Sequence, residues 1–362
     1  MKGLKIFRNS RVIITGHTGF KGSWLTAWLK QLGAKVMGIS LDPPTYPSHF
    51  GASKINLGIK DVRLDIRDKV KLEQKITAFK PNFVFHLAAQ SLVGLSYKNP
   101  TITWQTNVLG TLNVLESLRK LKNVCNVVII TSDKCYFNRE IHYGYKETDI
   151  LGGKDPYSGS KASAELLVKS YISSFFLSDK SKIRIATARA GNVIGGGDWA
   201  NNRIIPDCVR SWSKNKKAEL RNPNATRPWQ HVLESVGGYL CLAINLSFNK
   251  HLHGEAFNFG PNLSREYSVL ELVKTMGVYW KNISWKVIPK SRKKFYESEL
   301  LRLNCNKAKK ILKWKNILKF SETVEMVASW YRSYYDHPKN IDKITRKQIR
   351  EYEKLLKKRL IK

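Results

Sequence analysis

Three glycines at a spacing of three residues follow the first apolar segment of the chain. The segment is Val12-Ile13-Ile14-Thr15, and the glycines are Gly16, Gly19 and Gly22. In a strand–loop–helix unit the first glycine permits a tight turn, the second lets backbone amides approach a pyrophosphate, and the third lets the helix pack on the strand. The pattern predicts a dinucleotide-binding unit with the pyrophosphate at the helix N-terminus. The alternative is a glycine-rich turn with only a structural role.

The rest of the first half alternates short apolar segments with helix-like segments. The expected strands are 12–15, 35–39, 61–64, 82–86, 127–130 and 184–188, and the expected helices are 20–32, 69–79, 103–120 and 157–176. This order is typical of an α/β fold with a Rossmann-type, doubly wound parallel sheet. We therefore predict a dinucleotide-binding domain over residues 1–189.

The composition changes after Arg189, where glycine, tryptophan and proline crowd together. We predict a smaller mixed lobe over residues 190–336 that binds the substrate and interleaves with the first domain. Trp199 and Trp229 are expected in the core or between the lobes rather than as stacking platforms.

The segment 337–362 is predicted to be a basic amphipathic helix. Residues 339–362 hold ten Lys or Arg against three Asp or Glu. Apolar residues recur there at near-helical spacing, at Ile344, Ile349, Tyr352, Leu356 and Leu360. We expect this helix to pack on its own subunit, and the alternative is docking on a partner or a membrane surface.

The net charge of +35 has two interpretations. One is attraction to nucleic acid, an acidic membrane or anionic ligands, and the other is a lysine-rich composition spread over solvated faces. We favour the second and expect no nucleic-acid partner, because the lysines are spread along the chain without a nucleic-acid-binding motif.

The cysteines and the apolar segments restrict the class of protein further. The five cysteines (Cys125, Cys135, Cys208, Cys241 and Cys305) contain no Cys-x-x-Cys pair. We therefore expect reduced thiols and no metal site. No apolar stretch approaches the roughly 20 residues that a membrane span needs, and the N-terminus lacks a secretory signal. These features predict a cytoplasmic protein.

Tyr157 and Lys161 have the spacing Tyr-x-x-x-Lys, which places them on one face of a helix. A free tyrosine has a pKa of about 10 and is a poor base at neutral pH. A lysine cation nearby, together with the charge of a bound nicotinamide, lowers the pKa by stabilising the phenolate. We predict that Tyr157 takes a hydroxyl proton while a hydride leaves, and that Ser132 hydrogen-bonds the same oxygen.

Ser132-Asp133-Lys134 adds two proton-transfer groups that a simple alcohol dehydrogenase does not need. Asp133 is predicted to be a general acid, provided that burial raises its pKa. Lys134 is predicted to be a base, provided that desolvation and nearby cations lower its pKa. The tripeptide thus indicates an enzyme that oxidises, eliminates and then reduces again. The alternative is that Asp133 caps a turn while Lys134 contacts phosphate or solvent.

Residues after the next strands complete the predicted dinucleotide site. Asp42 lies where an acid binds the adenosine ribose, which favours NAD over NADP, and the alternative is a solvated loop aspartate. Asp65 is assigned to the adenine amino group, and Asn107 either orders water near Lys161 or satisfies a helix backbone. The predicted NAD-binding set is Gly16, Thr18, Gly19, Phe20, Gly22, Asp42, Asp65, Ile66, Leu87, Ala88, Ala89 and Asn107.

Five segments together resemble a known family. They are 15–24 (TGHTGFKGSW), 131–136 (TSDKCY), 152–158 (GGKDPYS), 188–200 (ARAGNVIGGGDWA) and 227–232 (RPWQHV). The chain resembles the extended short-chain dehydrogenase/reductase family from about Arg11 to Tyr335. Within that family it resembles the 4,6-dehydratases that act on CDP-glucose. Those enzymes resemble this chain in having a lysine where Lys134 stands, whereas dehydratases that act on dTDP-glucose or GDP-mannose have a glutamate there.

The resemblance implies an NAD-dependent lyase that oxidises CDP-glucose at carbon 4, removes water across carbons 5 and 6, and returns the hydride to carbon 6. It implies a homodimer formed by the helices that start near Thr103 and Tyr157. It also implies substrate contacts at Gln90, Asn192, Arg203, Arg227 and His231. Arg203 and Arg227 would face the pyrophosphate, which a guanidinium group binds well, and the alternative for both is a surface ion pair.

Some positions depart from the family pattern, namely Ser91, Gly94 and Tyr296. They bear on how the sugar and its phosphates are held rather than on the catalytic set. Two other functions stay open at this point. A sugar-nucleotide 4-epimerase shares the glycine loop and Tyr-x-x-x-Lys but has no use for Asp133-Lys134. A non-enzymatic module that senses NAD and binds nucleic acid is the second.

Overall fold

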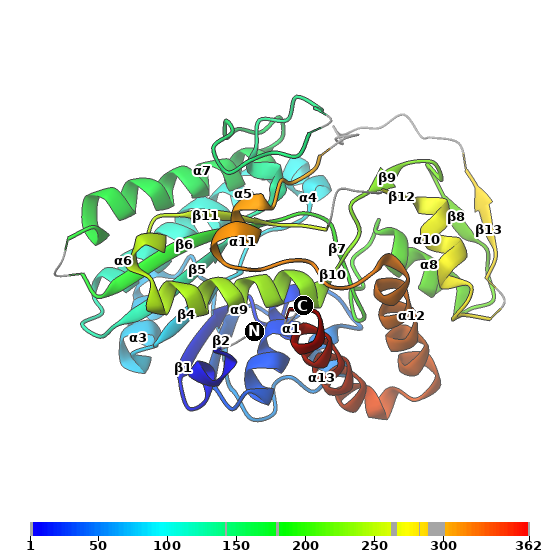
Figure 1. The fold of residues 1–362 in the computed structure, drawn as a ribbon, viewed down its shortest axis with the longest axis horizontal. Coiled ribbons are helices and arrows are strands. Elements are labelled where there is room, and N and C mark those ends of the chain that lie inside the picture. Colours follow the sequence, from blue (N-terminus) through cyan, green and yellow to red (C-terminus); the bar gives the residue numbers. More distant parts are fainter. Residues whose placement is uncertain are drawn as a thin grey trace.

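The computed structural model describes residues 3–141, 143–178, 181–261, 266–281, 283–288 and 301–360. Its centre is a seven-stranded sheet with the strand order β11-β6-β5-β4-β1-β2-β3, and all neighbouring strands are parallel (Figure 1). The strands are β1 (Arg11–Thr15), β2 (Lys35–Ser40), β3 (Lys60–Arg63), β4 (Phe83–His86), β5 (Cys125–Ile130), β6 (Ile183–Ala190) and β11 (Ala256–Phe259). The predicted Rossmann-type α/β fold is confirmed. The strand order reverses between β1 and β4, and ligands bind at the carboxyl ends of strands at such a reversal.

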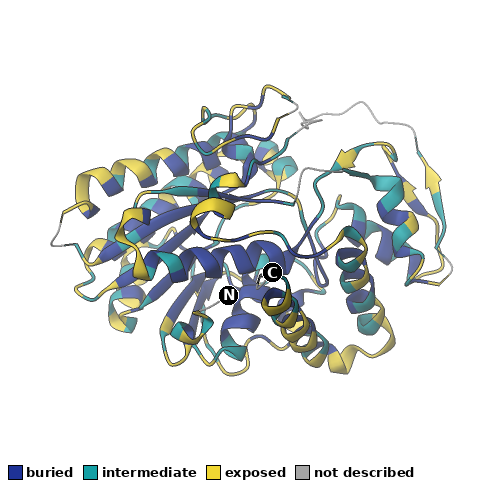
Figure 2. Ribbon diagram, in the orientation of Figure 1, coloured by how far each residue is buried: buried dark blue, intermediate teal, exposed yellow. Residues whose placement is uncertain are grey.

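Alternate residues of the central strands pack against opposite layers of helices. Val12 and Ile14 of β1 belong to the apolar core that also contains residues of α1 (Phe20–Gln31) and α9 (Val232–Phe248). Ile13 belongs to a second core, formed with α3 (Lys69–Phe79), α6 (Gly110–Arg119) and α7 (Pro156–Tyr171). Because helices cover both faces, β4 and β5 are buried along their whole length (Figure 2). This explains why β5 is a continuous apolar run in the sequence.

The predicted helix over residues 103–120 changes its helical type along its length. α5 (Pro100–Trp104) passes into a π-helical segment, η2 (Gln105–Leu109), and then into α6. A short helix that was not predicted, α4 (Val93–Lys98), precedes α5. α7 also ends in a π-helical segment, at Ile172–Phe176. π-Helical segments are frequent at functional sites, and Asn107 lies inside the first one.

The N-terminus of α7 is fixed by its capping residues. The Asp155 carboxylate accepts a hydrogen bond from the Ser158 backbone N–H at 3.0 Å, and Pro156 occupies the first helical position. Both are favourable choices for a helix start. Tyr157 therefore begins its helix in a well-defined orientation.

Segments beyond residue 190 contribute to both parts of the molecule. α9 covers one face of the central sheet, and β11 adds the seventh strand beside β6. The smaller part contains α8 (Ile204–Trp212), α10 (Val269–Met276), β8 (Ala218–Leu220) with β13 (Trp285–Val287), and β9 (Thr226–Arg227) with β12 (Tyr267–Ser268). β7 (Val193–Ile194) pairs with β10 (Gln230–His231) between the two parts. The chain thus crosses between them more than once (Figure 1).

Three further helices complete the layers of the fold. They are α2 (His49–Ala52), α11 (Asn306–Ile311) and α12 (Phe320–Asp336). α12 packs against α10 and leads into the last helix, α13. Trp199 is buried against Trp330, Tyr331 and Tyr334 of α12, and Trp229 donates a hydrogen bond to the Tyr267 carbonyl at 2.9 Å. Both tryptophans therefore have structural roles, as expected.

α13 (Ile341–Leu360) packs against α1 and α12 of the same chain. Its buried face includes Ile341, Ile349, Tyr352 and Leu356. Tyr352 donates a hydrogen bond to Glu234 of α9 at 2.8 Å, and Trp28 of α1 donates one to Glu353 at 2.7 Å. None of the helices in the described ranges has the length and apolarity to cross a bilayer.

Candidate active site

The glycine loop lies between β1 and α1, at the carboxyl edge of the central sheet. Gly16 has a φ of 78°, and a Cβ atom on it would lie 2.7 Å from the Ala88 backbone nitrogen. A Cβ atom on Gly22 would lie 2.1 Å from the Gly16 carbonyl oxygen. Both positions therefore require glycine. Thr18 ties the loop to β2, since its hydroxyl contacts Ser40 Oγ at 2.8 Å and donates to the Leu41 carbonyl at 2.9 Å.

The predicted acidic cofactor ligands differ in their surroundings. Asp42 follows β2 with 87% of its side chain exposed, and its nearest cation is Arg63, at 3.6 Å. Asp65 is held by Arg67, which donates to its carboxylate at 2.6 Å. Asp42 thus keeps its carboxylate available, whereas Asp65 is already engaged by its neighbour. Ile66 is buried against Gly110 of α6, and Leu87, Ala88 and Ala89 are half-buried after β4.

Asn107 joins two segments of the site. Its side-chain oxygen accepts the Gln90 backbone N–H at 2.8 Å, and its amide group donates to the Gln90 carbonyl at 3.0 Å and to Ser160 Oγ at 2.9 Å. The residue is buried in the π-helical segment η2. It therefore links the end of β4 to α7 directly. The Gln90 backbone lies in the loop after β4, so the bonds that Asn107 makes there do not satisfy a helix backbone.

Ser132, Asp133 and Tyr157 come together at the site. The Ser132 hydroxyl donates to Asp133 Oδ1 at 2.8 Å and accepts the Lys134 backbone N–H at 3.2 Å. Ser132 also acts on the Tyr157 phenol and opposes the rise of its pKa. The set follows β5, and Tyr157 and Lys161 reach it from the first turns of α7. Lys134 is half-buried beside it.

Burial shifts the pKa values of these groups in different directions. It raises the pKa of Asp133, against the opposing effects of Lys134 and the Ser132 hydrogen bond, and this is the direction that a general acid requires. Burial also lowers the pKa of Lys161 to about 8. It raises the pKa of Tyr157 to about 12, although the nearby Ser132 side chain opposes this. The expected lowering of the Tyr157 pKa is therefore not produced by the protein's own groups.

A buried ion pair lies one helical turn beyond Lys161. Arg189 of β6 donates to Glu165 of α7 through Nε at 2.9 Å and Nη2 at 2.8 Å, and both side chains are 4% exposed. Thr131 and Thr187 donate to the same carboxylate at 2.5 Å and 2.9 Å. The ion pair thus fastens the catalytic helix to the ends of β5 and β6. Sequence reasoning missed it, although Glu165 follows Lys161 by four residues.

The five predicted substrate residues do not all have free polar groups. Gln90 uses its side chain to bond the Leu92 backbone in its own loop and the Thr103 hydroxyl of α5. His231 is fully buried, and its Nδ1 accepts the Leu233 N–H at 3.2 Å as the cap of α9. The Nε2 of the same ring is buried and has no hydrogen-bond partner among the described residues, so this nitrogen stays available to a ligand. The His231 ring lies next to α1, the helix that follows the glycine loop, because it packs edge-on against Trp24.

The other three substrate candidates lie nearer to the surface. Asn192 is exposed just after β6. Arg203 forms an ion pair with Asp198 at 2.6 Å and interacts electrostatically with Tyr157. Arg227 of β9 donates to the Thr226 carbonyl at 2.9 Å. Ser91 is exposed and the Gly94 position has open space around it, whereas Tyr296 lies outside the described residues.

The structure also shows a residue at the site that sequence reasoning overlooked. Lys21, inside the glycine loop motif, interacts electrostatically with Asp133 and Lys161, and burial lowers its pKa to about 8. A lysine between the second and third glycines was the available signal. The thiols of all five cysteines are free and buried. In the described part of the chain no three His, Cys, Asp or Glu side chains gather as metal ligands would.

Residues 13–327 match the family model described as GDP-mannose 4,6 dehydratase. The chain therefore belongs to this family of extended short-chain dehydrogenase/reductases. It is 43% identical to the CDP-glucose 4,6-dehydratase of Salmonella typhimurium over 332 residues, which cover 91% of this chain and 92% of the relative. It is 29% identical to the dTDP-D-glucose 4,6-dehydratase of Dictyostelium discoideum, over 73% of this chain and 61% of that protein.

Solved structures share the fold at low sequence identity. The dTDP-glucose 4,6-dehydratase of Bacillus anthracis, solved in complex with NAD, has a TM-score of 0.72 and 21% identity, and the match covers 91% of this chain and 98% of that one. The epimerase Mth375 of Methanothermobacter thermautotrophicus has a TM-score of 0.79 and 23% identity, covering 94% and 97%. Dehydratases and epimerases therefore share this architecture, and the catalytic residues have to separate them.

Proposed function

We propose that this chain is a CDP-glucose 4,6-dehydratase, which converts CDP-glucose to CDP-4-keto-6-deoxyglucose. The observation that carries the proposal is the hydrogen bond from Ser132 to Asp133, a carboxyl group of raised pKa, at the place where Ser132 also acts on Tyr157. The 43% identity to a CDP-glucose 4,6-dehydratase over most of both chains supports the same substrate. An epimerase has no step that needs the added acid.

The cofactor is NAD, and the glycine loop fits it. Gly16 and Gly22 bring the backbone together so closely that a Cβ atom on either would collide with it. This leaves the backbone amides at the start of α1 open to a pyrophosphate. The exposed carboxylate of Asp42 suits the ribose hydroxyls and disfavours a ribose phosphate. When bound, NAD accepts a hydride from the sugar and returns it, and its nicotinamide ring adds a positive charge.

In the oxidation step Tyr157 takes the proton of the hydroxyl on carbon 4. Burial opposes the phenolate, as the Tyr157 pKa of about 12 shows. Lys161 holds a proton at neutral pH, since burial lowers its pKa only to about 8. Its positive charge adds to that of the bound cofactor, and both favour the phenolate. Ser132 opposes the effect of burial and acts to lower the pKa of the phenol.

In the elimination step Asp133 and Lys134 act on neighbouring carbons. A ketone at carbon 4 makes the proton on carbon 5 acidic, and Lys134 is the base proposed to remove it. Asp133, which burial keeps protonated to a higher pH, gives its proton to the departing hydroxyl on carbon 6. Water leaves, and carbon 6 becomes the position that accepts the hydride.

The segment after β6 and the smaller part of the chain are proposed to bind the sugar nucleotide. Asn192 and Arg203 lie near the carboxyl edge of the sheet, and Arg203 already interacts with Tyr157. Arg227 stands in the two-stranded sheet of β9 and β12. Guanidinium groups bind pyrophosphate oxygens with good geometry. We accordingly treat residues 1–189 as the cofactor domain and residues 190–336 as the substrate lobe.

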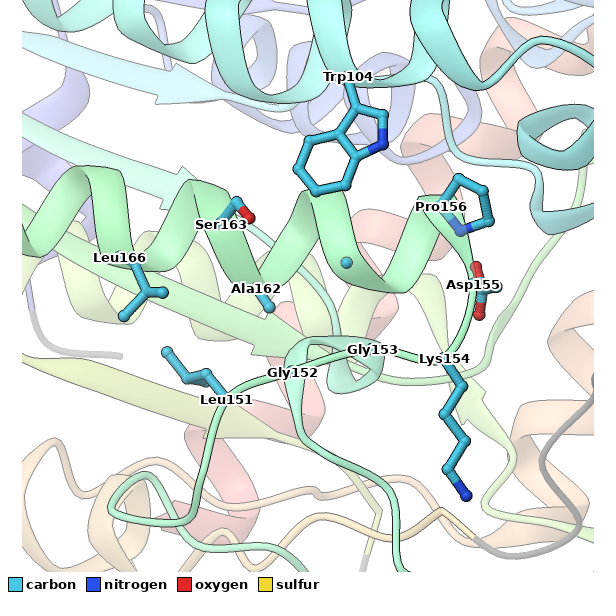
Figure 3. Close-up of a pocket in the computed structure, with 11 residues that line it drawn as sticks. Trp104, Leu151, Gly152, Gly153, Lys154, Asp155, Pro156, Ala162, Ser163 and Leu166 are labelled. Carbon is cyan, nitrogen blue, oxygen red and sulfur yellow. The ribbon is translucent and has the colours of Figure 1, made fainter.

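The subunit is proposed to form a homodimer through α5 and α7. A cavity of about 460 Å³ lies between these helices and the segment 151–156 (Figure 3). Trp104 stands at one side of it and Leu166 at the other, and both are substantially exposed. Exposed apolar side chains along α5, η2 and α7 are Ile102, Trp104, Leu109 and Leu166. Such a patch marks an interface, and replacing Leu166 by Glu should convert the dimer to a monomer in sedimentation measurements.

The cytoplasm is the proposed compartment for this enzyme. The five cysteines are free, which fits a reducing environment. Because the thiols are buried, they are shielded from oxidants in the solvent and stay free of disulfide bonds.

The deciding experiment is to incubate the purified protein and NAD with CDP-, dTDP-, GDP- and UDP-hexoses. A keto-deoxy sugar, detected by its chromophore in alkali, is expected with CDP-glucose. Deuterium at carbon 4 of the substrate should reappear in the new methyl group. A 4-epimer without loss of water would show that the chain is an epimerase instead. Unchanged CDP-glucose would refute the proposal.

A further inference from the structure

We propose that His49 is a positioning residue for the loop that leads to Arg203, and that Thr345 of α13 holds it in place. The link to the sugar nucleotide rests on the role given to Arg203 in the proposed function. α13 lies against α1 and α12, and it begins beyond residue 327, where the match to the family model ends (Figure 1). A helix outside the region shared with the family thus supports the active site of this chain.

The loop of residues 195–199 follows β7 and is held at two neighbouring carbonyl groups. Trp24 of α1 donates to the Gly196 carbonyl at 2.9 Å, and the His49 backbone N–H donates to the Gly197 carbonyl at 3.1 Å. Gly197 has a φ of 84°, and a Cβ atom on it would lie 2.5 Å from His49 Cβ. The loop therefore lies directly on His49, with no room for a side chain between them.

The His49 ring is bonded at both of its nitrogens. It stacks on the Trp24 ring, with the two centroids 4.5 Å apart and the planes 12° apart. Nδ1 lies 2.8 Å from Ser23 Oγ of α1, and Nε2 lies 3.2 Å from Thr345 Oγ1 of α13. All four of these side chains are buried. Burial lowers the pKa of His49 to about 3, so the ring is neutral and has one donor and one acceptor nitrogen.

The neighbouring groups decide which nitrogen is the donor. The Ser23 hydroxyl gives its proton to a backbone carbonyl of its own helix at 2.9 Å, so it accepts from His49 Nδ1. Nε2 is then the acceptor, and Thr345 supplies the proton to it. The Thr345 oxygen in turn accepts from Trp330 Nε1 at 3.0 Å and from Ser53 Oγ at 2.9 Å. One hydroxyl group of α13 therefore completes the hydrogen bonds of three buried side chains.

The same loop carries the partner of Arg203. Asp198 follows Gly197, and its carboxylate pairs with Arg203 at 2.6 Å. The Asp198 carbonyl accepts a hydrogen bond from Tyr331 of α12. If the loop moves away from His49, the ion pair moves with it, and the sugar nucleotide binds less tightly. The proton-transfer groups stand on η3 and α7 and keep their places.

The first test measures the loop and needs no sugar nucleotide. Hydrogen exchange of the His49 amide, which donates to Gly197, is followed by mass spectrometry with residue-level fragmentation in the NAD-loaded protein. Thr345→Val removes the hydroxyl that supplies Nε2 and should make this exchange about tenfold faster, because the segment opens locally more often. Thr345→Ser should restore the parent rate. Ser23→Ala removes the bond at Nδ1 and should act in the same direction, and it serves if the valine variant does not fold.

Arg359→Gln is the matched control on the same helix. Arg359 donates to Glu322 of α12 at 2.6 Å and to the Ile317 carbonyl, and in the described residues these bonds do not involve α1 or α2. It lies roughly 20 Å along α13 from Thr345. Its substitution should lower the melting temperature but leave the exchange of the His49 amide at the parent rate.

The second test uses CDP-glucose and separates binding from chemistry. Thr345→Val should raise KM about five- to tenfold and change kcat less than about twofold, because the lost contacts act on binding rather than on the transition state alone. Thr345→Ser should restore KM, and Arg359→Gln should leave it at the parent value.

Three outcomes would overturn the inference. One is parent-like exchange of the His49 amide in both Thr345→Val and Ser23→Ala. Another is an equal effect of Thr345→Val and Arg359→Gln, because α13 would then act only through overall stability. The third is faster exchange with an unchanged KM, because the loop would then not position Arg203. If the exchange responds as expected but CDP-glucose is not converted, the hold of His49 on the loop stands and the proposed substrate fails.

Discussion

Ser132 donates its hydroxyl proton to Asp133 Oδ1 over 2.8 Å. In this arrangement the Ser132 oxygen accepts from the Lys134 N–H and can give Tyr157 only an acceptor. A protonated Asp133 can reverse the bond, because a carboxylic acid is also a donor. Ser132 is then free to donate to a substrate oxygen. The protonation of the acid and the orientation of the serine are therefore one linked event.

Asp133→Asn should separate oxidation from elimination. The amide oxygen still accepts from Ser132, but the residue has no acidic proton for the departing hydroxyl. We expect the rate of dehydration to fall about 10²- to 10⁴-fold, the usual contribution of a positioned acid. Reduced cofactor should still form with CDP-glucose in single-turnover absorbance measurements. Product formation at the parent rate would exclude Asp133 as the acid.

The same substitution should stabilise the protein at neutral pH. The pKa of Asp133 is raised by burial, so the unfolded chain loses this proton at a lower pH than the folded chain does. Stability from this group is full below the unfolded pKa and is lost as pH rises through the folded pKa. Asparagine does not ionise, so Asp133→Asn avoids this loss of stability as the pH rises. Its melting temperature should exceed the parent value at pH 8, and the difference should vanish near pH 3.5, below the unfolded pKa of about 3.9.

Lys134→Gln should permit oxidation at carbon 4 yet block the loss of water. Lys134 is half-buried next to Asp133, and glutamine of similar length has no basic amine. Reduced cofactor is expected to accumulate, and no solvent deuterium should enter carbon 5. Mass spectrometry of the recovered sugar checks this. Dehydrated product made as fast as by the parent enzyme would show that another group removes the carbon 5 proton.

Tyr157→Phe should abolish the oxidation itself. Tyr157 is buried in the first turn of α7, and Ser132 acts to lower the pKa of its phenol. Reduced cofactor should not form above about 1% of the parent rate, the loss expected of a missing base. Unchanged NAD affinity in a titration would show that the site is intact. Normal formation of reduced cofactor would remove Tyr157 from the mechanism.

The sequence predicted the elements of the sheet because their signals are local. The apolar run of β5 indicates a strand buried on both faces, and the glycine loop indicates a close approach of the backbone. The structure has both features as expected. The seventh strand, β11, was not predicted, since its four residues form a strand only by pairing with β6. Gln90 and His231 show the same limit for side chains. The Gln90 side chain bonds Thr103, and the His231 ring accepts a bond from the start of α9. No pattern of residue types in the sequence reveals these partners.

The buried Glu165–Arg189 ion pair was also beyond prediction from the sequence, because its two residues lie 24 positions apart. Burial acts to raise the pKa of Glu165, and the Arg189 guanidinium and the hydrogen bonds outweigh it, so the pKa is lowered. Glu165→Gln would leave Arg189 buried without its counter-ion. We expect a loss of about 3 to 5 kcal/mol in the free energy of unfolding. Urea denaturation at pH 7 measures it.

Thr187→Val is the matched control, because it removes one hydrogen bond to Glu165 and keeps the ion pair. It should cost about 1.5 to 3 kcal/mol, the range for a bond to a charged group. The stability supplied by Glu165 is present above its unfolded pKa and is lost as pH falls through the lowered folded pKa. The difference in the free energy of unfolding between the parent protein and Glu165→Gln should therefore become smaller at acidic pH. Equal stability of the two proteins at pH 7 would mean that α7 is held to the sheet by its apolar contacts alone.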